Sequence, residues 1–201
     1  NVNVRKALNL SLDRNVITDK VLGQGQTPTY VFTPTYIEEG HLIQQPAYSK
    51  EPMAQRNEEA IKLLEEAGYS KANPLKFSIL YNTNENHKKV AIAAASMWKA
   101  NTKGLIDVKL ENQEWKTYID SRRAGRYDAA RAGWNADYNQ ATTFGNYFLS
   151  NSSNNTAKYA NPEYDKAIAE SYVATDAEGR AKAYAKAEEI LAKDFGIVPI
   201  F

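Results

Sequence analysis

The stretch "LKFSILYNTNENHKKVAIAAASMWKAN", residues 75–101, decides the fold because its apolar pattern changes partway along. Residues 75–82 read as a strand, whereas residues 84–101 carry apolar side chains on most sides of a helix that would pack against a sheet. A strand followed by a covering helix is the first half of a β-α-β unit. The sequence therefore predicts a sheet with parallel strands.

The same step recurs twice further along the chain. "LIDVKLENQ" (105–113) alternates as a strand and leads into helical "EWKTYIDSRRAG" (114–125). "YDAARAGW" (127–134) is predicted as a third strand, followed through a turn by a helix over 141–150. "GIVPIF" (196–201) would add one more strand. These steps predict an α/β fold with a largely parallel or mixed sheet covered by helices.

Helices are predicted at both ends of the chain. Near the start, Val4, Ala7 and Leu8 recur at helical spacing. Near the end, Asn161 before a proline is expected to cap one helix, and Thr175, three residues before a glutamate, is expected to cap another.

Composition excludes several classes of protein. The 201 residues include 25 Lys and Arg against 24 Asp and Glu, a net charge of +1 that is too small for a nucleic-acid partner. The absence of Cys excludes disulfides, Cys-ligated zinc and thiol catalysis. The chain begins without Met inside a predicted helix and ends inside an apolar run, so we expect residues 1–201 to be a single α/β lobe of a larger protein.

Catalytic motifs are missing as well. The sequence has no G-x-S-x-G, H-E-x-x-H, Walker loop or G-x-G-x-x-G, and His41 and His87 alone give little material for a metal site or a catalytic triad. We therefore expect no catalytic residues, no metal and no cofactor. A two-carboxylate hydrolase could be drawn from Glu114 and Asp137, but nothing in their spacing requires it.

One edge of the predicted sheet collects the candidate binding residues. In an open α/β sheet, ligands bind beyond the carboxyl ends of the strands. That rule selects His87 after the first strand, Trp115 after the second, and Trp134 and Asp137 after the third. Arg131 is expected within the third strand, near its end.

Each candidate also has a purely structural interpretation. Asp137 can bond its own turn, which is the commoner role of an aspartate there. Arg131 can pair with Asp128 or reach a ligand carboxylate. Gly133 can form a bulge or admit another backbone, and the two tryptophans can belong to the core. His87 can be an ordinary surface residue.

Four stretches resemble the periplasmic oligopeptide-binding proteins of ABC importers, including their murein-tripeptide-binding relatives. They are "LYNTNENHKK" (80–89), "NQEWKTYIDSR" (112–122), "ARAGWNADYN" (130–139) and "LSNSSNNTAKY" (149–159). The resemblance covers essentially the whole chain and implies the third domain of a two-lobed, type II-like solute-binding protein.

The resemblance assigns a role to each charged candidate. It implies that Asp137 pairs with the α-amino group of a bound peptide. It also implies that Arg131 and His87 meet the carboxyl terminus, with the choice between them depending on peptide length.

It further implies that Trp115 and Trp134 wall the side-chain pockets, while the backbone from Gly133 to Asn135 pairs with the peptide like an added strand. The expected partners are short peptides, the missing lobe of the same chain and a membrane permease, in a periplasmic monomer that is not an enzyme. The alternatives are a murein-peptide-specific relative and, from another class, a peptide or glycoside hydrolase.

Overall fold

The structure, a computed structural model, describes all residues 1–201 and divides into two compact units. The first unit comprises Asn1–Thr29, Ala47–Ala132 and Ile200–Phe201. The second comprises Tyr30–Pro46 and Gly133–Pro199. The sheet belongs entirely to the first unit, and each unit has buried residues of its own.

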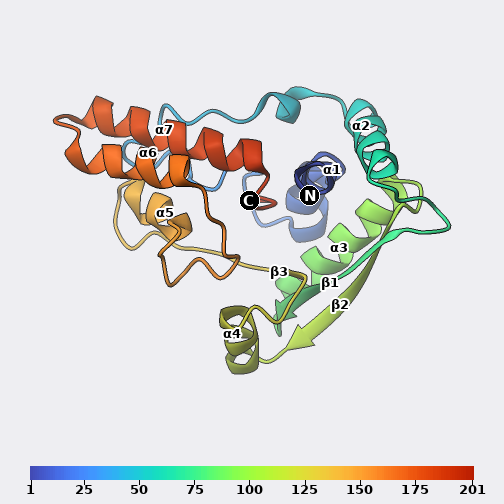
Figure 1. Ribbon diagram of the computed structural model, residues 1–201. Coiled ribbons are helices and arrows are strands. Elements are labelled where there is room, and N and C mark those ends of the chain that lie inside the picture. Colours follow the sequence, from blue (N-terminus) through green and yellow to red (C-terminus); the bar gives the residue numbers. More distant parts are fainter. The chain divides into compact units, whose positions relative to one another are not determined.

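The first unit contains a three-stranded sheet in the order β2-β1-β3 (Figure 1). Strand β1 (Leu75–Asn82) lies in the middle and pairs in parallel with β2 (Ile106–Gln113), from Leu75 opposite Ile106 to Asn82 opposite Gln113. It also pairs in parallel with β3 (Ala129–Ala130). The predicted parallel sheet is confirmed.

The third strand is much shorter than the predicted 127–134. Only Ala129 and Ala130 pair with β1, and Arg131 lies just beyond the strand, although its backbone N–H still donates to the Leu80 carbonyl. Before the strand, the Asp128 carboxylate takes the backbone N–H of Ser78 at 3.0 Å, so a side chain replaces a ladder bond there. After residue 132 the chain enters the second unit and leaves the sheet.

The helices and helical turns of the first unit include those predicted near the start of the chain and after the first two strands. They are α1 (Val2–Leu10), the π-helical η1 (Val16–Leu22), the 3₁₀ turn η2 (Ala47–Lys50), α2 (Met53–Glu66), α3 (Glu85–Asn101) and α4 (Trp115–Arg123). Helix α3 packs on β1 and β2, and its Trp98 donates its indole N–H to the Leu8 carbonyl of α1 at 2.9 Å.

Two buried arginines close the end of α1. Arg14 and Arg56 are 0% and 3% exposed, and their guanidinium groups donate to the main-chain carbonyls of Asn9 and Leu12. Arg56 also donates to the Leu10 carbonyl at 2.9 Å. The planar guanidinium offers five donors, which suits it to satisfying the carbonyls at a helix end.

The second unit is built on two long helices, α6 (Pro162–Val173) and α7 (Ala177–Asp194), which are joined by a short turn and lie side by side (Figure 1). The helix predicted over 141–150 is a short α5 (Thr142–Gly145) followed by a 3₁₀ turn η3 (Asn146–Phe148). Its aromatic residues Phe144, Tyr147 and Phe148 pack with Tyr164 and Ile168 in the core of this unit.

One predicted cap and one predicted strand differ from the structure. Asn161 caps α6 as expected, but α7 is capped by Asp176, whose carboxylate accepts the Gly179 N–H at 2.7 Å, and not by Thr175. A carboxylate one residue later reaches the free N–H groups of the first turn and carries the charge that a helix start favours. Residues 196–201 form no strand, because the backbone bond from Thr29 to Ile200 is not extended into a ladder.

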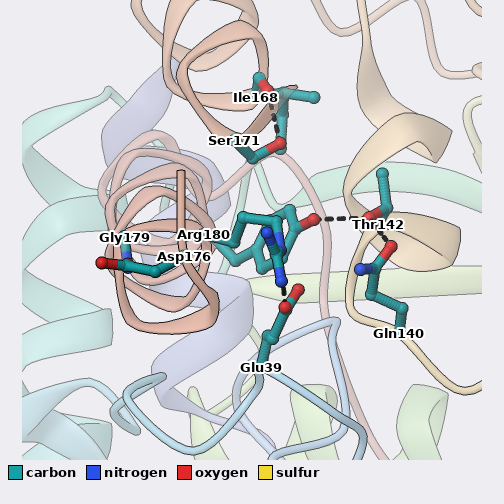
Figure 2. Close-up of polar contacts among 9 residues, drawn as sticks. Glu39, Gln140, Thr142, Ile168, Ser171, Asp176, Gly179 and Arg180 are labelled. Carbon is teal, nitrogen blue, oxygen red and sulfur yellow. Dashed lines mark hydrogen bonds and ion pairs between the residues drawn. The ribbon is translucent and has the colours of Figure 1, made fainter. Parts of the chain in front are cut away.

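The loop at the start of the second unit is fastened to α7 by a buried carboxylate. Glu188 lies 6% exposed and accepts the backbone N–H groups of Phe32 and Thr33, at 3.1 and 2.7 Å. Burial raises the pKa of Glu188, while the hydrogen bonds from Thr33 and Phe32 act in the opposite direction. Further along the loop, Glu39 pairs with Arg180 at 2.6 Å (Figure 2).

We expect Glu188→Ala to lower the free energy of unfolding by about 2–4 kcal/mol, because it leaves two N–H groups of the loop without a partner. The matched control is Glu189→Ala, which removes an exposed carboxylate paired with Lys193 and should change stability by less than about 1 kcal/mol. Urea unfolding of the two variants measures the difference. Equal losses in both would show that the Glu188 bonds do not hold the loop.

Candidate functional site

The carboxyl ends of β1 and β2 and the residue after β3 meet at one edge of the sheet. Asn82 and Gln113 lie opposite each other there, and Arg131 follows β3 beside Leu80. The helices α3 and α4 begin directly after β1 and β2, and the Asn84 side chain caps α3 by accepting the N–H groups of Asn86 and His87. Parallel pairing therefore brings His87 and Arg131 to the same edge, as predicted.

His87 is oriented by the last residue of β1. Its Nδ1 lies 2.9 Å from Oδ1 of Asn82, which is 6% exposed. Because an amide oxygen can only accept, His87 donates its Nδ1 proton and directs Nε2 away from Asn82. Burial, together with the positive charge of Arg131, lowers the pKa of His87.

Arg131 is partly buried and forms no ion pair. The sequence left open a pairing with Asp128, but that carboxylate accepts the N–H and hydroxyl of Ser78 instead. Burial lowers the pKa of Arg131, while a hydrogen bond with Tyr118 favours its charged form. The guanidinium is thus a desolvated cation without a carboxylate partner.

Tyr118 links these residues and was missed by the sequence analysis. It is fully buried on α4, donates its hydroxyl to the main-chain carbonyl of Arg131, and packs its ring against Trp115 with centroids 5.6 Å apart. Trp115 itself is 58% exposed. The first unit therefore joins Trp115, Tyr118, Arg131 and His87 in one group, and the spacing of Trp115 and Tyr118 on one helical face was the only signal in the sequence.

The remaining candidates lie in the second unit, in a segment without helix or strand. The backbone groups of Gly133, Trp134, Asn135 and Ala136 make no hydrogen bond within the chain. The Trp134 indole donates to the Thr143 carbonyl at 2.9 Å, and its ring lies edge-on to Tyr147 with centroids 5.2 Å apart. Trp134 thus packs against the core of this unit and is only partly exposed.

Asp137 is held by its main chain and not by its carboxylate. Its backbone N–H donates to Oγ1 of Thr143 at 3.1 Å, whereas the exposed carboxylate has no hydrogen-bond or ion-pair partner. The structure therefore does not contain the hydrogen bond between the Asp137 side chain and its own turn that the structural interpretation of this residue required. Thr143, like Tyr118, was not selected from the sequence.

A hollow of about 420 Å³ lies elsewhere in the second unit and includes none of the predicted site residues. Its wall carries a chain of hydrogen bonds in which Thr142 lies 2.5 Å from the Tyr184 hydroxyl and donates to Gln140 at 2.8 Å (Figure 2). No cluster of His, Asp or Glu side chains is placed to hold a metal ion, and no helix is long and apolar enough to span a membrane.

An open parallel α/β sheet covered by helices, with candidate binding residues beyond the carboxyl ends of its strands, is typical of ligand-binding lobes. The pattern that defines the bacterial extracellular solute-binding proteins, family 5 (middle), matches residues 1–156, and the chain belongs to this family. The expected family and fold class are confirmed.

Individual relatives agree with this assignment. The chain is 97% identical to the periplasmic oligopeptide-binding protein OppA of Haemophilus influenzae over all 201 residues, which span 37% of that protein's length. The crystal structure of Haemophilus influenzae OppA in complex with RPPGFSPFR matches the whole chain and 39% of its own with a TM-score of 0.99 and 96% identity. The murein tripeptide-binding protein MppA of Escherichia coli matches with a TM-score of 0.92 and 43% identity, over the whole chain and 39% of its own.

We expect Arg131→Gln to raise the pKa of His87, because it removes the positive charge that disfavours the imidazolium. An NMR titration of the 201-residue chain measures this pKa. The control Arg123→Gln removes an exposed charge at the end of α4 and should leave the pKa of His87 unchanged. An unchanged or lower pKa of His87 in Arg131→Gln would contradict the proximity of Arg131 to His87.

Proposed function

We propose that this chain is the peptide-binding lobe of a periplasmic, extracytoplasmic solute-binding protein that captures short peptides and delivers them to the membrane permease of an ABC importer. The full protein would work as a monomer of two lobes and catalyse no reaction. The proposal rests chiefly on Asp137, an exposed carboxylate whose backbone is fixed while its side chain has no partner.

A peptide brings an ammonium group that needs such a carboxylate. An unpaired charge taken out of water costs several kcal/mol, so a closed site must supply an opposite charge. We assign that role to Asp137. The relative whose structure contains the nonapeptide RPPGFSPFR supports this class of ligand.

The other end of the peptide carries a carboxylate, to which we assign Arg131 and His87. Arg131 is desolvated without an acid, and a guanidinium binds a carboxylate through two parallel hydrogen bonds. His87 directs Nε2 away from Asn82 and can donate from it once protonated. A bound carboxylate would raise the pKa of His87, so affinity through this residue should fall as the pH rises through that pKa.

The backbone and the side chains of the peptide would use different contacts. The free N–H and C=O groups from Gly133 to Asn135 can pair with an extended peptide, as an added strand does. Trp115 and Trp134 would supply apolar walls for side chains, Trp115 from its exposed position and Trp134 from its packing on Tyr147. Backbone pairing accepts any sequence, which suits a carrier of varied peptides.

The direct test is Asp137→Asn in the full-length protein. Because the carboxylate has no partner, the unliganded protein should keep its thermal stability. Peptides with a free amino terminus should bind at least about 30-fold more weakly, the expected effect of removing one member of a desolvated charge pair. Isothermal titration calorimetry measures both peptides with a free amino terminus and their N-acetylated forms.

The controls separate this account from its alternatives. N-acetylated peptides should bind weakly to the wild type and lose little on mutation, and Asp120→Asn, at an exposed carboxylate of α4, should change neither. Loss of stability with intact free-amine binding would make Asp137 a turn residue and contradict the proposed site. The isolated 201-residue chain should bind much more weakly than the full-length protein, because a single lobe leaves much of the peptide in water.

The same samples address the two other functions. Mass spectrometry after incubation should recover the peptide intact, whereas cleavage would indicate a hydrolase. Stronger binding of γ-linked, diaminopimelate-containing peptides than of ordinary peptides would indicate a murein-peptide carrier, the function named for the Escherichia coli relative that is 43% identical.

A further inference from the structure

Two consecutive threonines at the start of α5 have separate hydrogen-bond partners. Thr142 and Thr143 are both buried, at 6% and 5% exposure. The Thr142 hydroxyl joins Tyr184 and Gln140 in the wall of the hollow (Figure 2). The Thr143 hydroxyl instead accepts the backbone N–H of Asp137 at 3.1 Å. Neighbouring side chains of the same type thus serve different segments.

Thr143 provides both hydrogen bonds that fix the segment 133–137. Its hydroxyl takes the Asp137 N–H, and its main-chain carbonyl takes the Trp134 indole N–H at 2.9 Å. The backbone between these two points forms no other hydrogen bond. Thr143 itself is fixed by α5, where its N–H donates to the Gln140 carbonyl at 3.2 Å and its neighbour Phe144 lies in the core.

We propose that Thr143 is a positioning residue of the ligand site: its hydroxyl sets the direction of the Asp137 carboxylate toward a bound ammonium group. This inference rests on the proposed function and adds to it a residue that does not touch the peptide. Thr143 holds Asp137 through the main chain and leaves both carboxylate oxygens free for the ligand.

The physical reason is preorganisation. A segment without backbone hydrogen bonds samples several conformations, and binding has to overcome the entropy of ordering it. The bond to Thr143 orders Asp137 before the ligand arrives, so its loss should weaken charge-dependent binding in particular. The indole bond uses a carbonyl that every residue at position 143 retains, so side-chain substitutions isolate the contribution of the hydroxyl.

The test compares three variants of the full-length protein. Thr143→Val keeps the shape and removes the hydroxyl, Thr143→Ser restores a hydroxyl, and Thr142→Val removes the neighbouring hydroxyl from the wall of the hollow. We expect Thr143→Val to weaken free-amine peptides by about 5- to 30-fold, the effect of one lost hydrogen bond to a binding group. The serine variant and Thr142→Val should remain within about 2-fold of the wild type.

A double-mutant cycle distinguishes positioning from a general structural effect. In the Asp137→Asn background, Thr143→Val should cause little further loss for free-amine peptides, because there is no charge left to position. Binding of N-acetylated peptides should change little in any variant. Since Thr143 is buried, thermal unfolding of each protein is measured in parallel, and Thr143→Ala replaces Thr143→Val if the latter does not fold.

The outcomes separate this inference from the proposed function. If Asp137→Asn weakens free-amine binding but Thr143→Val and Thr143→Ala do not, the positioning role is overturned while the proposed function stands. If Thr143→Ser loses as much as Thr143→Val, the hydroxyl is not responsible and the role is overturned too. If Asp137→Asn itself has no effect, the site assignment fails and the inference fails with it.

Discussion

The parallel pairing of β1 with a strand on each side is the constraint on which the first unit depends. The carboxyl ends of parallel strands lie at the same edge of a sheet. Because Asn82 pairs with Gln113, helices α3 and α4 both begin at this edge, and because Leu80 pairs with Ala130, Arg131 lies there too. That register brings His87 and Arg131 to the same edge, where Asn82 and Asn84 hold His87. Arg131 carries a partly desolvated charge at this edge, and burial together with that charge lowers the pKa of His87. A partly desolvated cation that pairs with no carboxylate of the chain is a candidate position for an anionic ligand.

The second unit contains an exposed carboxylate, that of Asp137, at the end of a segment whose backbone groups from Gly133 to Ala136 make no hydrogen bond within the chain. Its long helices and the aromatic residues of α5 share one core. Thr143 of α5 binds Trp134 and Asp137 and so attaches residues 133–137 to that core. The loop at Tyr30–Pro46 is fastened separately, by Glu188 at Phe32 and Thr33 and by Arg180 at Glu39. Thr143 thus holds both ends of a segment, Trp134 to Asp137, whose intervening backbone forms no hydrogen bond within the chain.

Local pattern predicted those parts of the structure that depend on local interactions. The alternation in residues 105–113 and the helical faces of residues 85–101 predicted β2 and α3 almost to the residue. The rule that ligands bind beyond the carboxyl ends of parallel strands selected Asp137 and placed Arg131 near it, and the family resemblance supplied their expected roles. The third strand was predicted too long because the pattern of "YDAARAGW" is typical of a strand throughout. In the structure the Asp128 carboxylate replaces a backbone bond before Ala129, and the chain leaves the sheet after residue 131, so only two residues pair. The strand predicted over residues 196–201 is absent, because a strand needs a neighbouring strand to pair with and the apolar pattern does not show whether one is available. Tyr118 and Thr143 were missed since each acts through a main-chain atom.

The most direct measurement of the central claim is a crystal structure of the full-length protein with a short peptide that has both termini free. The account predicts the peptide's ammonium within hydrogen-bonding distance of the Asp137 carboxylate, its main chain paired with residues 133–135, and its carboxylate on Arg131 or His87. The Asp137 N–H should still donate to Thr143, as it does without ligand. A peptide whose ammonium lies on another acid, with Asp137 facing solvent, would contradict the account.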